Sequence, residues 1–275
     1  MRLTTSDICI DEHADPVAAV RATRTASVRL AHRAVRDGHA SAAVTASPLA
    51  VAVAAAGFTL QSAPGVTQPA FATFVGPAKR RAVLLDAGAS KAAGADALVQ
   101  LALCGAALAR TVGQVPVPRI GLLDGDADFR SGRGRPVHRA GALGASLARA
   151  GFATQIPGEF VGAVPAEAIA IGGLADVLVV DGATARLLLG AARGAAIAAS
   201  SVIMEADQPV DGKGGFVLGV NGVSVVARAA TPDAVAQALG WAVQAVESEL
   251  LDEVSASMTG LIANRRTDAG LGTSR

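Results

Sequence analysis

Short apolar runs, each followed by a longer stretch of helical periodicity, recur along the sequence and constrain the fold more than any other feature. The pairs are Ala42–Ala46 with 48–56, Ala82–Asp86 with 95–112, Arg119–Asp124 with 136–150, and Ala175–Asp181 with 184–199. The runs are apolar throughout rather than alternating, which is typical of strands buried on both faces. This order predicts an α/β protein in which helices cover both faces of a mainly parallel sheet.

Three of these apolar runs end in the same way. VLLDAG (83–88), GLLDGD (121–126) and VLVVDGA (177–183) each close with an aspartate that is followed at once or after one residue by a glycine. The carboxyl ends of parallel strands share one edge of a sheet, where loops and helix N-termini converge and ligands bind. We therefore expect these three loops to line a common cleft.

Helix signals are also clear near the N-terminus. Asp15 as an N-cap, Pro16 in the first turn and Gly38 after the last turn predict a helix over 16–37. Towards the C-terminus, the apolar runs Gly215–Val220 and Val223–Arg228 flank Asn221-Gly222, which predicts a β-hairpin with a type I′ turn.

An amphipathic stretch follows that hairpin, and it predicts a helix from Thr231-Pro232 to about Met258. The last residues have no apolar period, so we expect a flexible, frayed tail over 260–275. No linker divides the rest, which predicts a single α/β domain over 1–259, or two lobes of one.

Composition narrows the class of protein. A formal net charge of +1 lacks the basic excess of nucleic-acid-binding proteins. Cys9 and Cys104 have neither disulfide nor metal-ligand spacing, which favours a reducing compartment. The first residues carry acids where a signal peptide has a basic start, and the most apolar window, from Ser41, contains Pro48. We therefore expect a soluble cytoplasmic protein with at most peripheral membrane contact and no nucleic-acid partner.

The loop after the second run, GLLDGDADFRSGRGRP (121–136), has two possible chemistries. Asp124, Asp126 and Asp128 have the spacing of a calcium loop, but Phe129 stands where glycine is needed and Arg135 where the bidentate glutamate belongs. The spacing therefore does not favour a metal.

Arginines and glycines in the same loop suggest anion binding instead. Arg130, Arg133 and Arg135 could cradle a phosphate or carboxylate, because guanidinium groups bind such oxygens bidentately and glycine lets the backbone approach. The alternative is a solvated surface loop whose acids and arginines neutralise one another.

Motifs for other enzyme classes are missing from the sequence. It has no G-x-S-x-G elbow, no G-x-G-x-x-G after a strand and no G-x-x-x-x-G-K-[ST] loop. The histidines are scattered, and we expect each to be a surface residue rather than a general base; they are His13, His32, His39 and His138. No cofactor is indicated.

Taken in order, the loops resemble those of the bacterial phosphate acyltransferases, which convert acyl carrier protein thioesters into acyl phosphates for phospholipid synthesis. The segments that carry this resemblance are HADPVAAVRATRTASVRLAHRAVRDGHASAAVTA (13–46), VLLDAGA (83–89), PVPRIGLLDGDAD (116–128), ADVLVVDGATA (175–185) and GGFVLGVNGVSVVARAA (214–230). The similarity runs in register from about His13 to Glu249.

This resemblance implies a fold and a chemistry. Such enzymes are similar to the isocitrate and isopropylmalate dehydrogenase fold, a three-layer α/β/α sandwich that forms dimers. Phosphate attacks a thioester carbonyl directly, so the reaction needs no protein nucleophile and no cofactor, but it needs an anion site and groups that stabilise an oxyanion. The implied partners are acyl carrier protein or acyl coenzyme A, phosphate or another small acceptor, and a second copy or a paralogue.

Several family positions carry a different side chain here. The family's opening "D-x-M-G-G-D" loop has no counterpart, so we expect an N-terminally shortened and divergent member. The family's "S-A-G-N-T-G" corresponds to 45–50, its "K" of "E-E-x-K-G" to Ser131, its last asparagine of "D-G-F-T-G-N" to Arg186, and its histidine of "S-H-G" to Arg228.

By the resemblance, a site is expected in which the backbone-shaping residues remain and some polar side chains have changed. The expected catalytic residues are Asp181, Arg186 and Ser131. The expected substrate-binding residues are Thr45, Ser47, Asp86, Gly88, Ser90, Lys91, Asp124, Arg130, Gly182, Thr184 and Arg228. Arg130 and Lys91 would hold the anion, and Asp181 would orient the acceptor. Backbone N–H groups near Gly88 and Gly182 would face the carbonyl oxygen.

Two functional hypotheses follow. In the first, the chain is a divergent acyltransferase that uses phosphate or another small acceptor, including an amine or hydroxyl in secondary metabolism. In the second, it is a non-catalytic homologue that binds acyl carrier protein or a catalytic paralogue as a regulator or scaffold.

Overall fold

The computed structural model describes residues 5–11, 13–90, 93–124, 145–146, 158–200 and 214–271. Its helices are α1 (Pro16–Ala22), α2 (Ser27–Arg36), α3 (Leu49–Leu60), the 3₁₀ turn η1 (Ala78–Arg80), α4 (Ala95–Thr111), α6 (Ala168–Ile171), α7 (Gly182–Ser200), α8 (Pro232–Glu247) and α9 (Leu250–Leu271). Its strands are β1 (Ala42–Thr45), β2 (Ala70–Val75), β3 (Ala82–Leu85), β4 (Arg119–Leu123), β5 (Glu159–Val164), β6 (Val177–Val179), β7 (Gly214–Leu218) and β8 (Val223–Ala227).

Within the described residues, the strands form one sheet in the order β1-β8-β7-β2-β3-β6-β4-β5. Four of its strand pairs are parallel, namely β1–β8, β3–β6, β6–β4 and β4–β5. The other three, in the middle of the sheet, are antiparallel. The predicted α/β fold with a mainly parallel sheet is therefore confirmed.

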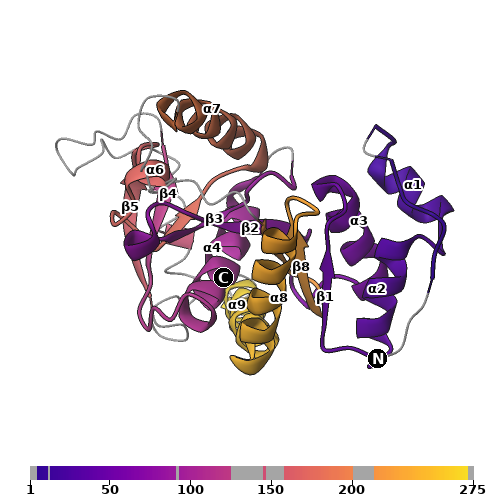
Figure 1. Ribbon diagram of the computed structural model, residues 1–275. Coiled ribbons are helices and arrows are strands. Elements are labelled where there is room, and N and C mark those ends of the chain that lie inside the picture. Colours follow the sequence, from indigo (N-terminus) through magenta and orange to yellow (C-terminus); the bar gives the residue numbers. More distant parts are fainter. Residues whose placement is uncertain are drawn as a thin grey trace.

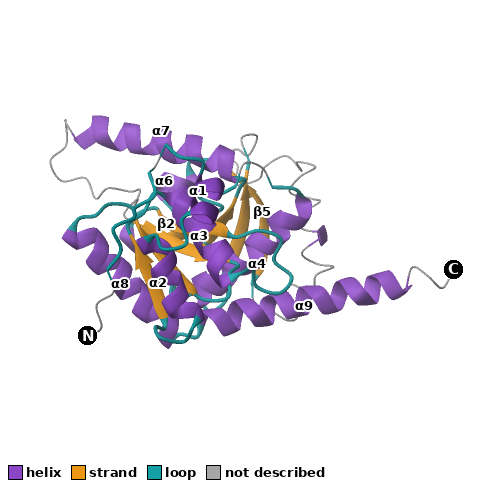
Figure 2. Ribbon diagram, turned by 90° about the vertical axis from the view of Figure 1, so that its right-hand side faces the viewer, coloured by secondary structure: helices purple, strands orange, loops and turns teal. Residues whose placement is uncertain are grey.

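Helices cover the sheet on both faces, which gives three layers (Figures 1 and 2). One core lies between the sheet and α4, α8 and α9, and it contains Phe74, Phe216, Trp241 and Met258. The other core lies on the opposite face, against α3, α6 and the first half of α7. Strand residues alternate between the two cores, as Leu84 and Leu85 do, so both faces of the sheet are buried.

The predicted first helix is divided in two. Asp15 caps α1 as expected, with its side chain accepting the N–H of Ala18 at 2.6 Å. The chain leaves the helix at Thr23, whose hydroxyl donates back to the Ala19 carbonyl, and it resumes at Ser27. The prediction of one helix over 16–37 is wrong because a break of four residues lets both halves pack on α3.

The predicted C-terminal helix is divided as well. α8 ends at Glu247, and Glu249 adopts a positive φ of 56° before α9 begins. This turn directs Leu250, Val254 and Met258 of α9 into the core beneath α4. α9 then continues as far as Leu271, so the expected tail without regular structure is helical over 260–271.

The predicted hairpin of β7 and β8 is confirmed, but its turn is not of type I′. That turn needs positive φ at Asn221 and Gly222, and in this connection only Gly219 has it, at 79°. The segment after α3 pairs with the turn instead, because the Ala63 N–H donates to the Gly219 carbonyl and the Asn221 N–H donates to the Gln61 carbonyl.

Candidate functional site

The carboxyl ends of β3, β6 and β4 lie side by side at one edge of the sheet. The register pairs Leu85 with Val179 and Val179 with Leu122. The aspartates that follow these strands, Asp86, Asp181 and Asp124, therefore reach the same edge. We call this edge the carboxyl edge.

Asp86 organises the loop that follows β3. Its side chain is fully buried, and its carboxylate accepts backbone N–H groups from Phe71 (3.1 Å), Gly88 (3.1 Å), Ala89 (2.9 Å) and Ser90 (2.6 Å). These N–H donors replace the water that the charge gives up on burial. Asp86 thus shapes the loop from within, and its oxygens are not presented to a substrate.

The N-terminus of α7 packs directly on this loop. A Cβ atom at Gly182 would lie 2.8 Å from Asp86 Oδ2 and closer still to the carbonyl oxygen of Ser90, so only glycine fits. The Gly182 N–H also donates to Ser90 Oγ at 3.4 Å. The first turn of a long helix is therefore fixed against the β3 loop.

Arg186, one turn into α7, joins the same two elements. Its Nη1 donates to the carbonyl oxygens of Gly88 (2.7 Å) and Ser90 (3.2 Å). Gly88 has a φ of 119°, and a Cβ atom there would meet Arg186 Cγ at 2.8 Å. Among the described residues, Nε and Nη2 of Arg186 have no partner, and the residue is exposed. Part of the guanidinium group therefore remains available at the carboxyl edge.

Asp181 caps α7. Its carboxylate accepts the backbone N–H of Thr184 at 3.0 Å and the hydroxyl of Thr184 at 2.8 Å. Both residues are thus at the expected edge, where they stabilise the helix start.

The expected oxyanion donors are in part used within the protein. The N–H of Gly88 is directed to Asp86 and the N–H of Gly182 to Ser90. These two N–H groups are therefore engaged within the protein, and the expectation that N–H groups near Gly88 and Gly182 face a substrate carbonyl stays a prediction for their neighbours.

A groove of about 320 Å³ opens beside the loop. Its residues come from one face of α3, from the segment after α3 and from the β3 loop; they are Val53, Ala54, Gly57, Phe58, Ser62, Gln68, Pro69, Ala89 and Ser90. Sequence reasoning missed this groove. One residue in the sequence could have indicated it, namely Phe58, a large apolar side chain near the end of an alanine-rich helix. Phe58 is 39% exposed in the structure.

Three expected site residues lie at the opposite edge of the sheet. β1 and β8 run against β3, so Thr45, Ser47 and Arg228 follow strand ends that point away from Asp86. Thr45 and Ser47 hydrogen bond to each other at 2.8 Å. The pKa of Arg228 is lowered, mainly because the side chain is desolvated by burial and to a smaller extent because Arg193 carries a like charge. The structure does not bring these three residues to the carboxyl edge.

Other expected residues lie outside the described part of the chain. They are Lys91, Asp126, Asp128, Phe129, Arg130, Ser131, Arg133, Arg135 and His138, together with most of the helix predicted over 136–150. Their roles stay predictions. Among the described residues, no group of three His, Cys, Asp or Glu side chains is placed to hold a metal ion.

His32 is not a surface residue, as the sequence suggested, but a fully buried one. Its Nδ1 lies 2.7 Å from the Val28 carbonyl oxygen, which makes Nδ1 the protonated nitrogen, and its Nε2 lies 2.9 Å from Ser224 Oγ. Burial lowers the pKa of His32, although the hydrogen bond to Val28 opposes this shift. The imidazole joins α2 to β8.

In the part of the chain that the structure describes, no helix combines the length and apolarity that crossing a bilayer requires.

The three-layer α/β fold is shared with solved phosphotransacylases. A phosphotransacetylase from Streptococcus pyogenes aligns with a TM-score of 0.60 and 19% identity over 84% of this chain and 70% of that chain. A branched-chain phosphotransacylase from Enterococcus faecalis V583 aligns with a TM-score of 0.55 and 18% identity, over 81% and 80% of the two chains. At these identities the likeness concerns the fold.

Sequence comparison gives the family. Residues 1–209 match the family described as fatty acid synthesis protein, and the chain belongs to that family. A phosphate acyltransferase of Rhodospirillum centenum is 35% identical over 183 residues, which cover 66% of this chain and about half (49%) of that protein. A phosphate acyltransferase of Rhodopseudomonas palustris BisA53 is 31% identical over an alignment of 279 positions, gaps included, which covers 92% of this chain and 78% of that protein. The resemblance read from the ordered motifs is thereby confirmed.

Proposed function

We propose that this protein transfers an acyl group from a thioester, carried by acyl carrier protein or coenzyme A, to phosphate. The observation that carries the proposal is the assembly of the Asp86 loop, the N-terminus of α7 and Arg186 at the carboxyl edge. Relatives at 30% identity or more that are named phosphate acyltransferases support the same chemistry.

Charge at this edge favours an anionic acceptor. The guanidinium group of Arg186 is exposed there and can bind the oxygens of an anion, whereas the N-terminus of α7 is already capped by Asp181. The hydroxyl of neighbouring Thr184 donates to Asp181 and so holds that carboxylate at the helix start. Phosphate bound here would contact Arg186, an expected catalytic residue, and would lie near Gly182 and Thr184, which are expected substrate-binding residues. Lys91 and Arg130 are the further cations expected to hold it.

The reaction itself needs only two bond changes. A phosphate oxygen attacks the thioester carbonyl carbon, and the resulting oxyanion collapses with cleavage of the C–S bond, so that the products are an acyl phosphate and a thiol. Because phosphate is the nucleophile, the protein contributes by holding both reactants in contact and by stabilising the negative charge of the tetrahedral species. Arg186 is the described residue best placed to do so.

The groove beside the loop would hold the acyl chain. It begins at Ala89 and Ser90 of the Asp86 loop and runs along the apolar face of α3. Its volume of about 320 Å³ is at the lower end of ligand pockets, which favours a short acyl chain or the first part of a longer one. Ala54 lines the groove, so a larger side chain there would narrow it, whereas Ala50 on the same helix is exposed and outside the groove.

A non-catalytic role is the second candidate, and one observation favours it. Asp86 and the N–H groups of Gly88 and Gly182 are all used to build the loop. A protein that kept this architecture only to dock acyl carrier protein or a paralogue would also retain them.

Direct assay decides between the candidates. The protein is incubated with phosphate and acyl thioesters of increasing length, and acyl phosphate is trapped with hydroxylamine. We expect product that depends on phosphate, and a preference shifted towards shorter chains in Ala54→Leu but not in Ala50→Leu. Absence of product at every chain length with both donors, while the protein still co-purifies with acyl carrier protein, would replace catalysis by the docking role.

A further inference from the structure

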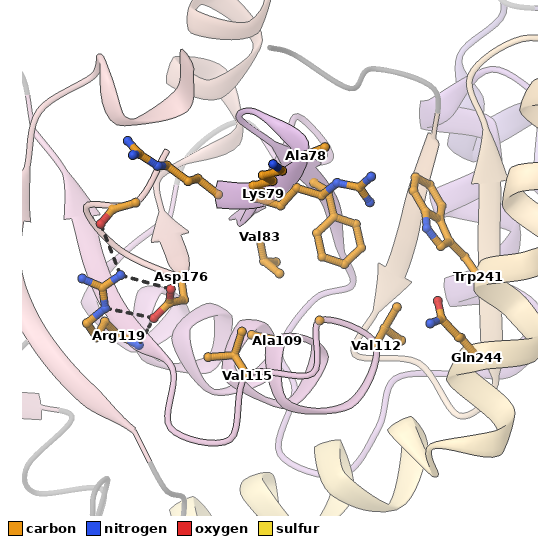
Figure 3. Close-up of a pocket in the computed structure, with 15 residues that line it drawn as sticks. Ala78, Lys79, Val83, Ala109, Val112, Val115, Arg119, Asp176, Trp241 and Gln244 are labelled. Carbon is orange, nitrogen blue, oxygen red and sulfur yellow. Dashed lines mark hydrogen bonds and ion pairs between the residues drawn. The ribbon is translucent and has the colours of Figure 1, made fainter. Parts of the chain in front are cut away.

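A second pocket, of about 520 Å³, lies at the edge of the sheet opposite to the carboxyl edge (Figure 3). It is enclosed by the turn between β2 and β3, the C-terminal end of α4 and one face of α8. Its volume falls within the range of small-molecule sites, which is roughly 300–1,000 Å³. No step of the proposed acyl transfer uses it.

Positive charge gathers on one side of this pocket. Lys79, Arg80 and Arg81, in and after η1, are consecutive, exposed lining residues. Arg119 lines it too, but Asp176 accepts hydrogen bonds from its Nε (3.1 Å) and Nη2 (3.2 Å), and these bonds raise the pKa of Arg119. Among the described residues of the pocket, Asp176 is the one anion, so the η1 cations are not neutralised from within.

The opposite wall is apolar. Figure 3 shows Val83, Ala109, Val112 and Val115 below the lysine and Trp241 at the side, next to Gln244. Trp241 is buried and contacts the rings of Phe74 and Phe216 at tilted angles, so the indole is part of the apolar wall. A bound molecule would therefore meet charge on one side and hydrocarbon on the other.

The cationic turn is held in a fixed position. Gly172 has a φ of 61°, and a Cβ atom there would collide with the carbonyl oxygen of Arg80, so only glycine lets the two turns pack. Arg119 ties the same region down by donating to the carbonyl oxygen of Gly173 at 3.3 Å. A turn whose backbone is already fixed loses less conformational entropy when a ligand binds than a mobile turn does.

We propose that this pocket binds an organic phosphate with at least two negative charges, whose non-phosphate part lies against the apolar wall. Three adjacent cations suit the several oxygens of a phosphate or pyrophosphate better than those of a single carboxylate. Such a ligand lies apart from the reaction site, because β3 (Ala82–Leu85) separates Arg81 from Asp86 by five residue steps, or about 16 Å along the strand. It is thus a separate ligand of the protein and not the phosphate that is acylated.

The chain provides its own probe of this pocket. Trp241 is the single tryptophan and the sequence has no tyrosine, so intrinsic fluorescence reports from the pocket wall. The probes are adenosine diphosphate and phenyl phosphate as organic phosphates, pyrophosphate as charge alone, and adenosine as a ring without charge. Isothermal titration calorimetry gives the stoichiometry and an independent affinity.

The variants are matched in charge. The double variant Lys79→Gln/Arg81→Gln removes two cations from the pocket, whereas Arg24→Gln/Arg36→Gln removes two exposed cations near α1 and α2. We expect one organic phosphate per chain, bound more tightly than pyrophosphate and adenosine. We expect at least about tenfold weaker binding in the first variant, and unchanged binding in the second.

Three results would each overturn the proposal. The first is no saturable signal with either organic phosphate up to a few millimolar. The second is equal weakening by the two double variants, which would mean non-specific attraction to a cationic surface. The third is binding of pyrophosphate or adenosine that is as tight as binding of adenosine diphosphate. Tight binding of pyrophosphate would mean that the apolar wall does not contribute to recognition, and tight binding of adenosine would mean that the cations do not.

Discussion

The two edges of the sheet deal with polar groups in opposite ways. At the carboxyl edge, Asp86 is buried and satisfied by four backbone N–H groups, and Gly182 and Arg186 pack against the resulting loop. At the opposite edge, the cations of η1 are exposed beside an apolar wall. The difference indicates that the first edge is built to hold a precise loop geometry, whereas the second leaves its charge for a ligand.

Removing the buried carboxylate should have the largest effect on stability. Asp86→Ala leaves four backbone N–H groups without their acceptor in a dry interior, and each unsatisfied group costs about 1–3 kcal/mol. We expect the free energy of unfolding to fall by at least about 3 kcal/mol, measured by urea denaturation. Asp37→Ala, an exposed carboxylate paired with Arg36, is the control, and an equal loss in both variants would contradict the assigned role of Asp86.

Close packing of α7 on the loop should have the next largest effect. Gly182→Ala places a methyl group against the Ser90 carbonyl, so we expect a loss of about 2 kcal/mol and reduced acyl transfer. In the same helix, Gly190 has open space around it, and Gly190→Ala should be neutral or stabilising by up to about 1 kcal/mol. Thermal unfolding of the two variants tests this; a stable Gly182→Ala variant would mean that the loop and helix are not tightly packed.

His32 should make stability depend on pH. Its pKa is lowered in the folded chain, so below about pH 6.5 the unfolded chain binds more protons than the folded chain. The free energy of unfolding should therefore fall as pH is lowered from 7 to 5, by up to about 1.4 kcal/mol per pH unit. Above pH 7 the contribution of His32 is fully present. Denaturation of wild type and His32→Gln across this range checks the slope, which should be shallower in the variant.

The smallest effect is expected at the partly exposed ion pair of the second pocket. Arg119→Gln breaks the contacts with Asp176, but water and salt screen such pairs, so we expect a loss of at most about 1 kcal/mol. Chemical denaturation at low and high salt measures it. A loss above about 3 kcal/mol would show that this edge also depends on a tightly built polar network.

Much of the fold was predictable from the sequence, because uninterrupted apolar runs reveal buried strands and the Asp-Gly ends of β3, β4 and β6 reveal a shared edge. Strand direction elsewhere was not. β2 and β7 insert between the two parallel parts of the sheet and reverse the direction of β8 and β1. No local pattern in Ala42–Thr45 encodes that reversal, so the sequence could not show that Thr45 and Arg228 lie away from the carboxyl edge, and their binding roles stay predictions.

The contents of the carboxyl edge were predictable only in part. Asp86, Gly88, Asp181 and Gly182 were found because backbone-shaping residues follow strands in a recognisable order. The hydrogen bonds of these residues could not be predicted, since a carboxylate after a strand can face a ligand or turn inward to its own loop. The second pocket was invisible in the sequence, because its walls come from segments as distant as Lys79 and Trp241.

One comparison tests the central claim most directly, namely that Arg186 at the carboxyl edge stabilises negative charge during acyl transfer. Acyl phosphate formation is measured for Arg186→Gln and for Arg193→Gln, which removes the same charge from the same helix two turns further on. The account predicts at least about a hundredfold loss of kcat/KM in the first variant with unchanged far-ultraviolet circular dichroism, and near wild-type activity in the second. Equal activity of the two variants would contradict it.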